Sequence, residues 1–208
     1  MVLCTTYLKV DKILRDIGWK NDVLVYRGSV NDKLLRWKKA ADKFNVEFFV
    51  TFDGDDLLCE PTLANLAFDQ FDRGNADFIE AKNVPCGAFT YGIKTAALNK
   101  VCEIKASRDT EMMEPYFTKT GLFTVEQLEN VPPDLKRPEL RMTMDYPEDL
   151  TFFDKIYQNF NDRVSLIDVI AYLDDHPEII AINRHCQQKY LDNQKRLEKI
   201  KLKGFNQA

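Results

Sequence analysis

The first half of the chain alternates short apolar runs with segments whose apolar residues recur at helical spacing. The predicted strands are 2–6, 23–26, 46–52 and 76–80, and the predicted helices between them are 12–17, 29–44 and 61–74. The run 46–52 is nearly continuous, as is typical of a strand buried on both faces. Strands and helices alternating at this spacing predict βαβ units, and therefore an α/β fold with a doubly wound, mostly parallel sheet.

The boundaries of these helices carry their own local signals. Ser29 is the expected N-cap of one helix, and Pro61 and Gly74 are the expected start and stop of another. The second half is less regular. Its predicted strands are 88–93 and 140–144, its predicted helices are 94–103, 147–156, 165–173 and 183–203, and an amphipathic stretch covers 108–119. No internal repeat or low-complexity linker forces a domain boundary.

Composition narrows the functional class. A chain of 208 residues with 45% hydrophobic content is long enough for one domain with a proper core. A net charge of -4 argues against a protein that coats nucleic acid. The five cysteines form no CxxC pair, which favours neither a zinc site nor a disulfide framework, and two histidines are too few for a His-rich metal centre. No apolar run approaches the ~20 residues that span a membrane.

A cluster of carboxylates follows the most apolar strand. Asp53, Asp55 and Asp56 come directly after the run 46–52, and ligands of open α/β sheets collect at the carboxyl ends of strands. Three carboxylates in one place repel one another, and a hard cation such as Mg²⁺ would relieve that repulsion. The alternative is a solvated acidic turn that only precedes the helix at Pro61.

A second aspartate repeats this arrangement far along the chain. The extended stretch 140–144 ends at Asp145, and Pro147 begins the next helix. Asp145 could serve only as an N-cap, the commonest use of Asp before a helix. It could also meet the first cluster on one divalent ion, provided that the two strands are neighbours. The residues alone leave both interpretations open.

Three segments carry a resemblance to a known family. VLVYRGSVNDKLLRW, VTFDGDDLLCEPTL and LRMTMDYPEDL resemble the cytidylyltransferases that activate acylneuraminate and 3-deoxy-manno-octulosonate, and the spore-coat polysaccharide biosynthesis branch of that family. Gly54-Asp55 resembles the family's metal-binding turn, and Asp145 with the PEDL that follows resembles its D-x-PEDL motif. The order and spacing agree over roughly residues 1–183.

The resemblance implies a fold, a reaction and a site. The fold would be a Rossmann-like three-layer α/β/α nucleotidyltransferase domain over 1–183, followed by a charged C-terminal helix over 184–208. A sugar hydroxyl or sugar phosphate would attack the α-phosphorus of CTP or a related nucleotide and release pyrophosphate, with Mg²⁺ held by Asp55 and Asp145. The implied nucleotide-binding residues are Arg27, Arg36, Asp53 and Gly54, and the implied acceptor-binding residues are Arg108, Glu111 and Arg141. Each arginine would equally suit a surface ion pair or a solvated charge.

One departure from the family pattern concerns the N-terminus. The family opens with a strand and a glycine- and arginine-rich loop that wraps the nucleotide phosphates, whereas this chain begins where the second strand is expected. We therefore expect an N-terminally truncated form with an open sheet edge, which would take a separate N-terminal segment as a partner.

Two other functions fit part of the same pattern. Asp53-Gly54-Asp55 is an Asp-x-Asp, which metal-dependent glycosyltransferases use to bind a nucleotide-sugar diphosphate. A non-catalytic chain that needs a separate N-terminal half would explain the absent loop. The basic residues over 183–203 are interleaved with acidic ones, which favours a solvated or dimer-packing helix over a nucleic-acid arm. The resemblance also implies a cytoplasmic homodimer.

Overall fold

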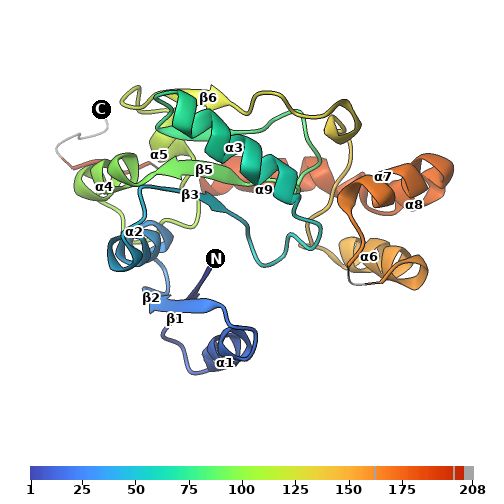
Figure 1. The fold of residues 1–208 in the computed structure, drawn as a ribbon, viewed down its shortest axis with the longest axis horizontal. Helices are drawn as coiled ribbons and strands as arrows, with labels where there is room; N and C mark the ends of the chain where they lie inside the picture. The colour runs from blue at the N-terminus through green and yellow to red at the C-terminus, as the bar shows by residue number, and fades with distance from the viewer. Residues whose placement is uncertain (162, 199, 204–208) are drawn as a thin grey trace. The chain divides into compact units, whose positions relative to one another are not determined.

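The computed structural model describes residues 1–161, 163–198 and 200–203 (Figure 1). The chain divides into two compact units. The first unit contains Met1–Phe49, Lys94–Phe123 and the described residues from Glu198 onward, and the second contains Val50–Ile93 and Thr124–Leu197. The predicted domain over 1–183 thus contributes residues to both units. Residues 199 and 204–208 of the predicted C-terminal helix lie outside the described residues.

The first unit begins with the predicted βαβ unit. Strand β1 (Val2–Thr6) pairs in parallel with β2 (Leu24–Gly28), and helix α1 (Lys12–Lys20) connects them. The unit's other described helices are α2 (Lys33–Phe44), α4 (Thr95–Ile104) and the short α5 (Pro115–Thr118). Helix α5 is the only helix in the predicted amphipathic stretch 108–119, all of which the structure describes. The prediction of Ser29 as the N-cap of α2 is wrong. Asp32 caps the helix by accepting a hydrogen bond from Leu35 N, while Ser29 Oγ accepts one from Asp32 N.

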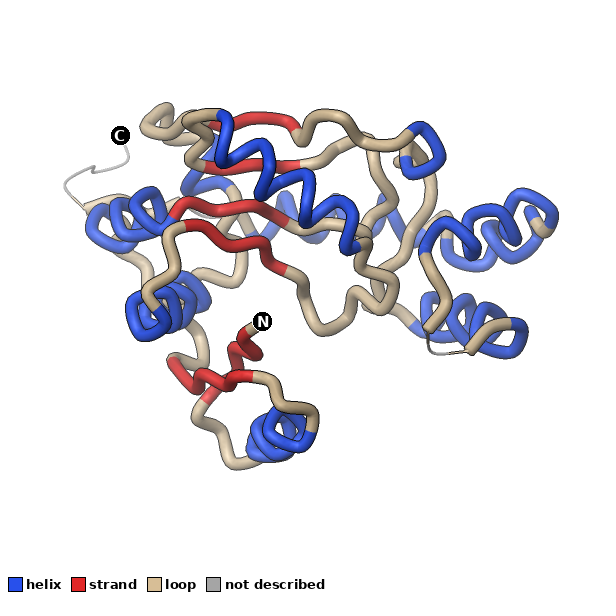
Figure 2. Tube along the Cα trace, viewed as in Figure 1, coloured by secondary structure: helices blue, strands red, loops and turns tan. Residues whose placement is uncertain are grey.

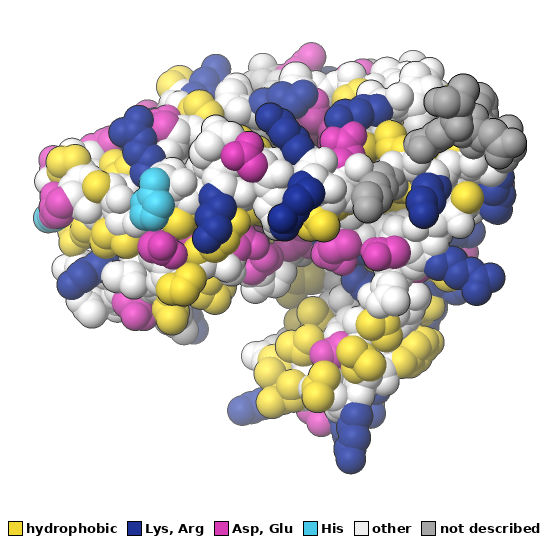
Figure 3. Space-filling model, turned by 180° about the vertical axis from the view of Figure 1, so that it is seen from behind, with side chains coloured by type: hydrophobic (Ala, Val, Ile, Leu, Met, Phe, Trp, Pro, Cys, Tyr) yellow, Lys and Arg dark blue, Asp and Glu magenta, His cyan; other side chains and the backbone are white. Residues whose placement is uncertain are grey.

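The N-terminal part of the first unit exposes many apolar side chains. Tyr7, Val10, Ile13 and Trp19 have exposed fractions of 67%, 76%, 62% and 60%. Figure 3 shows hydrophobic side chains gathered over this part of the unit. Elsewhere in the unit the helices are amphipathic in the usual sense, because α2 and α4 bury Leu34 and Leu98 completely.

The larger sheet has the strand order β3-β5-β4-β6 and does not include β1 or β2; its strands are drawn in red in Figure 2. Its strands are β3 (Phe48–Thr51), β4 (Phe78–Glu80), β5 (Tyr91–Lys94) and β6 (Val125–Gln127). Strand β4 pairs antiparallel with β5 and parallel with β6, so the prediction of a mostly parallel sheet is wrong. A parallel pair needs a crossover connection, but the chain runs from β4 to β5 without a helix and returns alongside itself.

The second unit contains the helices that follow β3 and those of the C-terminal third of the chain. Helix α3 (Pro61–Arg73) has the predicted start and stop, and Gln70 Nε2 ties it to β6 by donating to Glu126 and to the Gln127 carbonyl. The remaining helices are α6 (Pro147–Asn159), α7 (Leu166–Asp175), α8 (Pro177–Asn183) and α9 (Cys186–Leu197), after a single 3₁₀ turn η1 (Pro133–Leu135). The predicted helix 183–203 is therefore the last residue of α8 followed by a separate α9.

The predicted strand over 140–144 is not a strand. Only an isolated parallel bridge joins Cys86 to Arg141, with Met142 N donating to the Cys86 carbonyl at 2.6 Å. The segment is nevertheless extended and sequestered, since Leu140, Met142 and Thr143 are all buried. No helix within the described ranges combines the length and the apolar content that crossing a membrane requires.

Candidate functional site

The predicted site residues fall into two groups. Asp53, Gly54, Asp55, Arg141 and Asp145 belong to the second unit. The first unit contains the other predicted residues, which are Arg27, Arg36, Arg108 and Glu111.

In the second unit, the two aspartate segments meet through the backbone. Met144 N donates a hydrogen bond to the Asp55 carbonyl at 3.1 Å, which places the turn after β3 beside the residue that precedes Asp145. The condition that the two strands are neighbours is not met, because the 140–144 segment joins no strand ladder. Gly87 permits the approach on the other side of this segment: its φ is +93°, and a Cβ there would lie 2.5 Å from the Met142 carbonyl oxygen.

An ion-pair network orients Asp145. Arg141 Nη2 contacts Asp145 Oδ2 at 2.6 Å, while Arg141 Nε and Nη2 donate to the two carboxylate oxygens of Asp149 at 2.8 and 3.0 Å. The side chains of Arg141 and Asp149 have no exposed surface, whereas that of Asp145 is 31% exposed. Among the described residues, no hydrogen bond uses the other carboxylate oxygen of Asp145. The buried pair thus holds one oxygen of Asp145 and leaves the other available.

Asp149 is the centre of this network. Its Oδ2 accepts hydrogen bonds from the backbone N–H groups of Asp145 and Tyr146, and its Oδ1 accepts one from Asn183. Burial alone would raise the pKa of Asp149, but the hydrogen bonds and charge of Arg141, with these backbone donors, hold that pKa below its ordinary value. The N-cap of α6 is Tyr146, so the alternative that Asp145 is only the N-cap is wrong.

The Arg141 guanidinium also contacts Gln187 of α9 and the rings of Tyr146 and Tyr190. Arg141 Nη1 donates to Gln187 Oε1 at 3.1 Å. The guanidinium carbon lies 5.4 Å from the ring centroid of Tyr146 and 4.9 Å from that of Tyr190, within the range of cation–π contacts. Arg141 was predicted to bind an acidic acceptor. The structure instead commits its donors to protein groups and seals its side chain from solvent.

Asp56, the third carboxylate of the cluster after β3, has a pKa well above its ordinary value. Burial raises the pKa of Asp56 from 3.8 to about 7, opposed by a hydrogen bond to Thr143 and reinforced by the neighbouring charges of Asp55 and Asp53. Thr90 Oγ1 donates to Asp56 Oδ2 at 3.3 Å. Crowded carboxylates that raise one another's pKa are the surroundings in which a hard divalent cation gains most, and carboxylate oxygens are the ligands that Mg²⁺ prefers. The donor chemistry of these residues therefore suits that ion, although no three of the carboxylates of Asp53, Asp55, Asp56 and Asp145 bring oxygens within 4.8 Å of one another in the part of the chain that the structure describes.

The first unit contains a pocket of about 600 Å³ with basic groups in its lining. Arg108 lines the pocket with an exposed side chain, and Lys105 lines it while buried in an ion pair with Asp32 at 2.5 Å. Thr110 Oγ1 also donates to Asp32 at 2.9 Å. The pocket is therefore lined by the buried Lys105–Asp32 ion pair and by the exposed cation of Arg108. Glu111 is exposed and is not among the lining residues.

The other two predicted arginines hold loops. Arg27 donates from Nε to the Thr6 carbonyl and from Nη2 to the Leu8 carbonyl, both at 2.8 Å. Arg36 Nη1 donates to the Ser29 carbonyl at 2.6 Å. Its Nε is buried, and no partner for it occurs in the part of the chain that the structure describes.

Sequence reasoning missed the residues that position the site. Asp149 was identified only as part of the D-x-PEDL motif, and no role was predicted for its side chain. An acidic side chain at the third position of a helix is a known signal for capping of the backbone N–H groups at the helix start. Asn183 and Gln187 carry no comparable signal, because they reach Arg141 and Asp149 only through the packing of α8 and α9.

Comparison with known proteins supports the fold. No family model matches the sequence. The uncharacterized protein MJ1063 of Methanocaldococcus jannaschii is 28% identical over 193 residues, which cover 91% of this chain and 79% of that protein. The spore coat polysaccharide biosynthesis protein SpsF of Bacillus subtilis is 27% identical over 184 residues, covering 86% and 76%. A solved cytidylyltransferase from Leptospira borgpetersenii superposes with a TM-score of 0.74 at 24% identity, covering 86% of this chain and 77% of that one. The chain is thus a distant relative of SpsF with a cytidylyltransferase-like α/β fold.

Proposed function

We propose that the chain is a nucleotidyltransferase of activated-sugar synthesis, with CTP as the favoured nucleotide. The similarity to SpsF and to a cytidylyltransferase supports this class of reaction. The observation that carries the proposal is the hydrogen bond between Met144 N and the Asp55 carbonyl. It joins two carboxylate segments that are far apart in the sequence, which supports a ligand shared by Asp55 and Asp145.

Asp55 and Asp145 would hold Mg²⁺ in this proposal. The ion supplies Lewis-acid stabilisation of the phosphate charge when it is bound. Asp145 would present the carboxylate oxygen that Arg141 does not use, and Asp53 and Gly54 would shape the turn on the nucleotide side. We propose Arg141 and Asp149 as positioning residues, because their buried pair fixes both the backbone and the carboxylate of Asp145.

The proposed chemistry is one displacement at phosphorus. An oxygen of the sugar or sugar phosphate forms a bond to the α-phosphorus of CTP, the bond to the β-phosphate breaks, and pyrophosphate leaves. If the acceptor is a hydroxyl, its proton passes to a base or to water. Such catalysis depends mainly on positioning and on charge stabilisation.

The predicted residues of the first unit enter the proposal in two ways. Arg108 has an exposed side chain that would suit an acidic ligand, and Arg27 and Arg36 would fix the loops whose carbonyls they bind. The predicted roles of Arg27 and Arg36 in nucleotide binding, and of Arg108 and Glu111 in acceptor binding, stay predictions. The homodimer, the cytoplasmic location and a separate N-terminal segment stay predictions.

Pyrophosphate release tests the proposal. The full chain is incubated with CTP, Mg²⁺ and a set of acidic sugars and sugar phosphates, alone and with a peptide that supplies a glycine- and arginine-rich strand and loop. We expect release in at least one arm, and its loss in Asp55→Ala and Asp145→Ala but not in Asp154→Ala, a change of an exposed aspartate on α6. Release only with the peptide selects the split-chain form.

Two results would count against this function. Free nucleoside diphosphate formed from a nucleotide sugar would select the glycosyltransferase alternative that Asp53-Gly54-Asp55 also allows. Absence of pyrophosphate in both arms, from protein that melts cooperatively, would select the non-catalytic alternative.

A further inference from the structure

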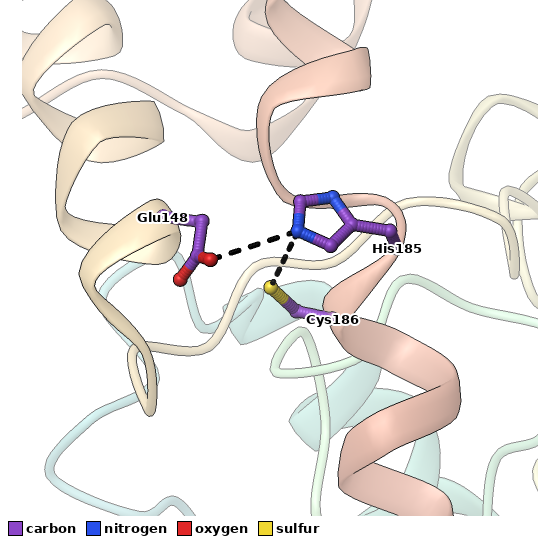
Figure 4. A group of neighbouring side chains, drawn as sticks. All are labelled: Glu148, His185 and Cys186. Carbon is purple, nitrogen blue, oxygen red and sulfur yellow. Dashed lines mark hydrogen bonds and ion pairs between the residues drawn. The ribbon is translucent and has the colours of Figure 1, made fainter.

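Three side chains of the second unit, from two distant parts of the sequence, bring their donor atoms together (Figure 4). Glu148 belongs to the first turn of α6, His185 lies between α8 and α9, and Cys186 begins α9. His185 Nε2 lies 3.6 Å from Glu148 Oε1 and 3.7 Å from Cys186 Sγ, and all three donor atoms lie within 4.8 Å of one another. Figure 4 shows the three groups pointing toward a common point.

The two separations from His185 Nε2 are close to the edges of a metal tetrahedron. With Zn–S of about 2.3 Å and Zn–N and Zn–O of about 2.0–2.2 Å, tetrahedral geometry puts ligand atoms roughly 3.4–3.6 Å apart. The two distances from His185 Nε2 are therefore close to those of a bound ion. Small side-chain rotations, not backbone movement, would bring the thiol and the carboxylate into place.

The donor set selects the metal. One thiolate, one imidazole and one carboxylate suit a borderline-soft ion such as Zn²⁺, whereas Mg²⁺ requires oxygen ligands. The Asp55–Asp145 corner offers oxygen only. The two groups of ligands therefore differ in chemistry as well as in residues.

We propose that Glu148, His185 and Cys186 bind one Zn²⁺, with water at the fourth position. The cysteine spacing gave no indication of zinc, because two of these ligands are adjacent and the third comes from another helix. The proposal does not depend on the nucleotidyltransferase activity.

The position of the ion gives it a structural role. Glu148 precedes Asp149, and Cys186 precedes Gln187. Two of the three ligands are therefore next to a residue that accepts a hydrogen bond from Arg141. A bound Zn²⁺ would link the start of α6 to the start of α9 around this network. Since the metal binds thiolate, binding would also release the thiol proton of Cys186.

Metal titration of the full chain tests the proposal. Protein stripped with a chelator and exchanged into chelator-free buffer is titrated with Zn²⁺ against a chromophoric competitor, and separately with Co²⁺ while the absorption spectrum is recorded. We expect one Zn²⁺ per chain and a thiolate-to-cobalt charge-transfer band in the near ultraviolet. In Cys186→Ser the band should disappear, and the Zn²⁺ affinity should fall by more than about tenfold, the lower end of what loss of an outer-shell partner causes.

Three further variants keep the test decisive. His185→Asn should lower the affinity similarly without a folding defect, because the side chain of His185 is 65% exposed. Cys102→Ser, a cysteine of the first unit, and Asp55→Ala should both keep the wild-type Zn²⁺ affinity. Equal Zn²⁺ binding by wild type, Cys186→Ser and His185→Asn would overturn the proposal, and so would a Co²⁺ spectrum without the thiolate band.

Discussion

Two aspartates of the second unit follow the same local pattern and reach opposite electrostatic states. Asp56 comes three residues after Asp53, and Asp149 comes four residues after Asp145. A helix begun by proline follows Asp56, and another contains Asp149. Burial favours the neutral form of both. The Arg141 guanidinium and backbone donors hold the pKa of Asp149 low, whereas the nearby Asp53 and Asp55 leave the pKa of Asp56 at about 7.

The second unit thus has a balanced corner around Asp149 and an unbalanced corner around Asp56. Around Asp149 the buried charge is balanced within the protein, so this corner is complete without a ligand. Around Asp56 the charge is not balanced by a protein cation among the groups that shift its pKa. A corner of that kind stores a free-energy cost that a bound cation would remove. In the proposed site, the balanced corner would position Asp145 and the unbalanced corner would supply Asp55.

The largest effect is expected from Asp149→Ala. This change leaves a fully buried guanidinium with only Asp145 as an acid partner and removes the acceptor of two backbone N–H groups. Removal of one member of a buried ion pair costs about 3–5 kcal/mol. Urea denaturation should show a loss of this size in the free energy of unfolding.

A matched change on the same helix sharpens this result. Asp154 is exposed on α6, and Asp154→Ala should change the free energy of unfolding by no more than about 0.5 kcal/mol. Similar losses in both variants would mean that the buried network contributes nothing specific.

Asp56→Asn should change how stability depends on pH. The folded-state pKa lies above the ordinary value, so the carboxyl favours folding only while it is protonated. That contribution is complete below about pH 4 and is lost as the pH rises through about 7. A rise of about three units corresponds to at most about 4 kcal/mol. Denaturation at pH 5 and pH 8 with a chelator present should show the variant gaining stability over wild type at the higher pH, and an unchanged difference would contradict the assignment.

Gly87→Ala should have a smaller effect than either carboxylate change. Its positive φ strains any side chain, and the new Cβ would press on the Met142 carbonyl. We expect a loss of about 1–3 kcal/mol. Gly54→Ala is the matched control, because no atom lies within 4 Å of its Cβ position. Thermal melting of both variants measures the difference, which should vanish if the 140–144 segment yields without cost.

Local signals predicted the elements better than their pairing. The N-terminal βαβ unit and the limits of α3 agree with the expected strands and helices, because apolar periodicity, Pro61 and Gly74 act within a few residues. The mostly parallel sheet was wrong, because the return of the chain from β4 to β5 depends on a connection without helical periodicity. The segment 140–144 looked like a strand because buried extended backbone has the same apolar pattern whether or not it joins a ladder.

The sequence by itself determined that the chain is an α/β protein with acidic residues after one strand and before one helix. Only the tertiary structure decided how those residues differ. The pKa of a buried carboxyl depends on how deeply the fold buries it and on which charges the fold brings within a few ångströms of it. The approach of Met144 to Asp55 and the meeting of Glu148 with His185 and Cys186 join segments that lie tens of residues apart. Arg141 and Asp149 are close in sequence, but only the packing of the second unit seals their ion pair from solvent.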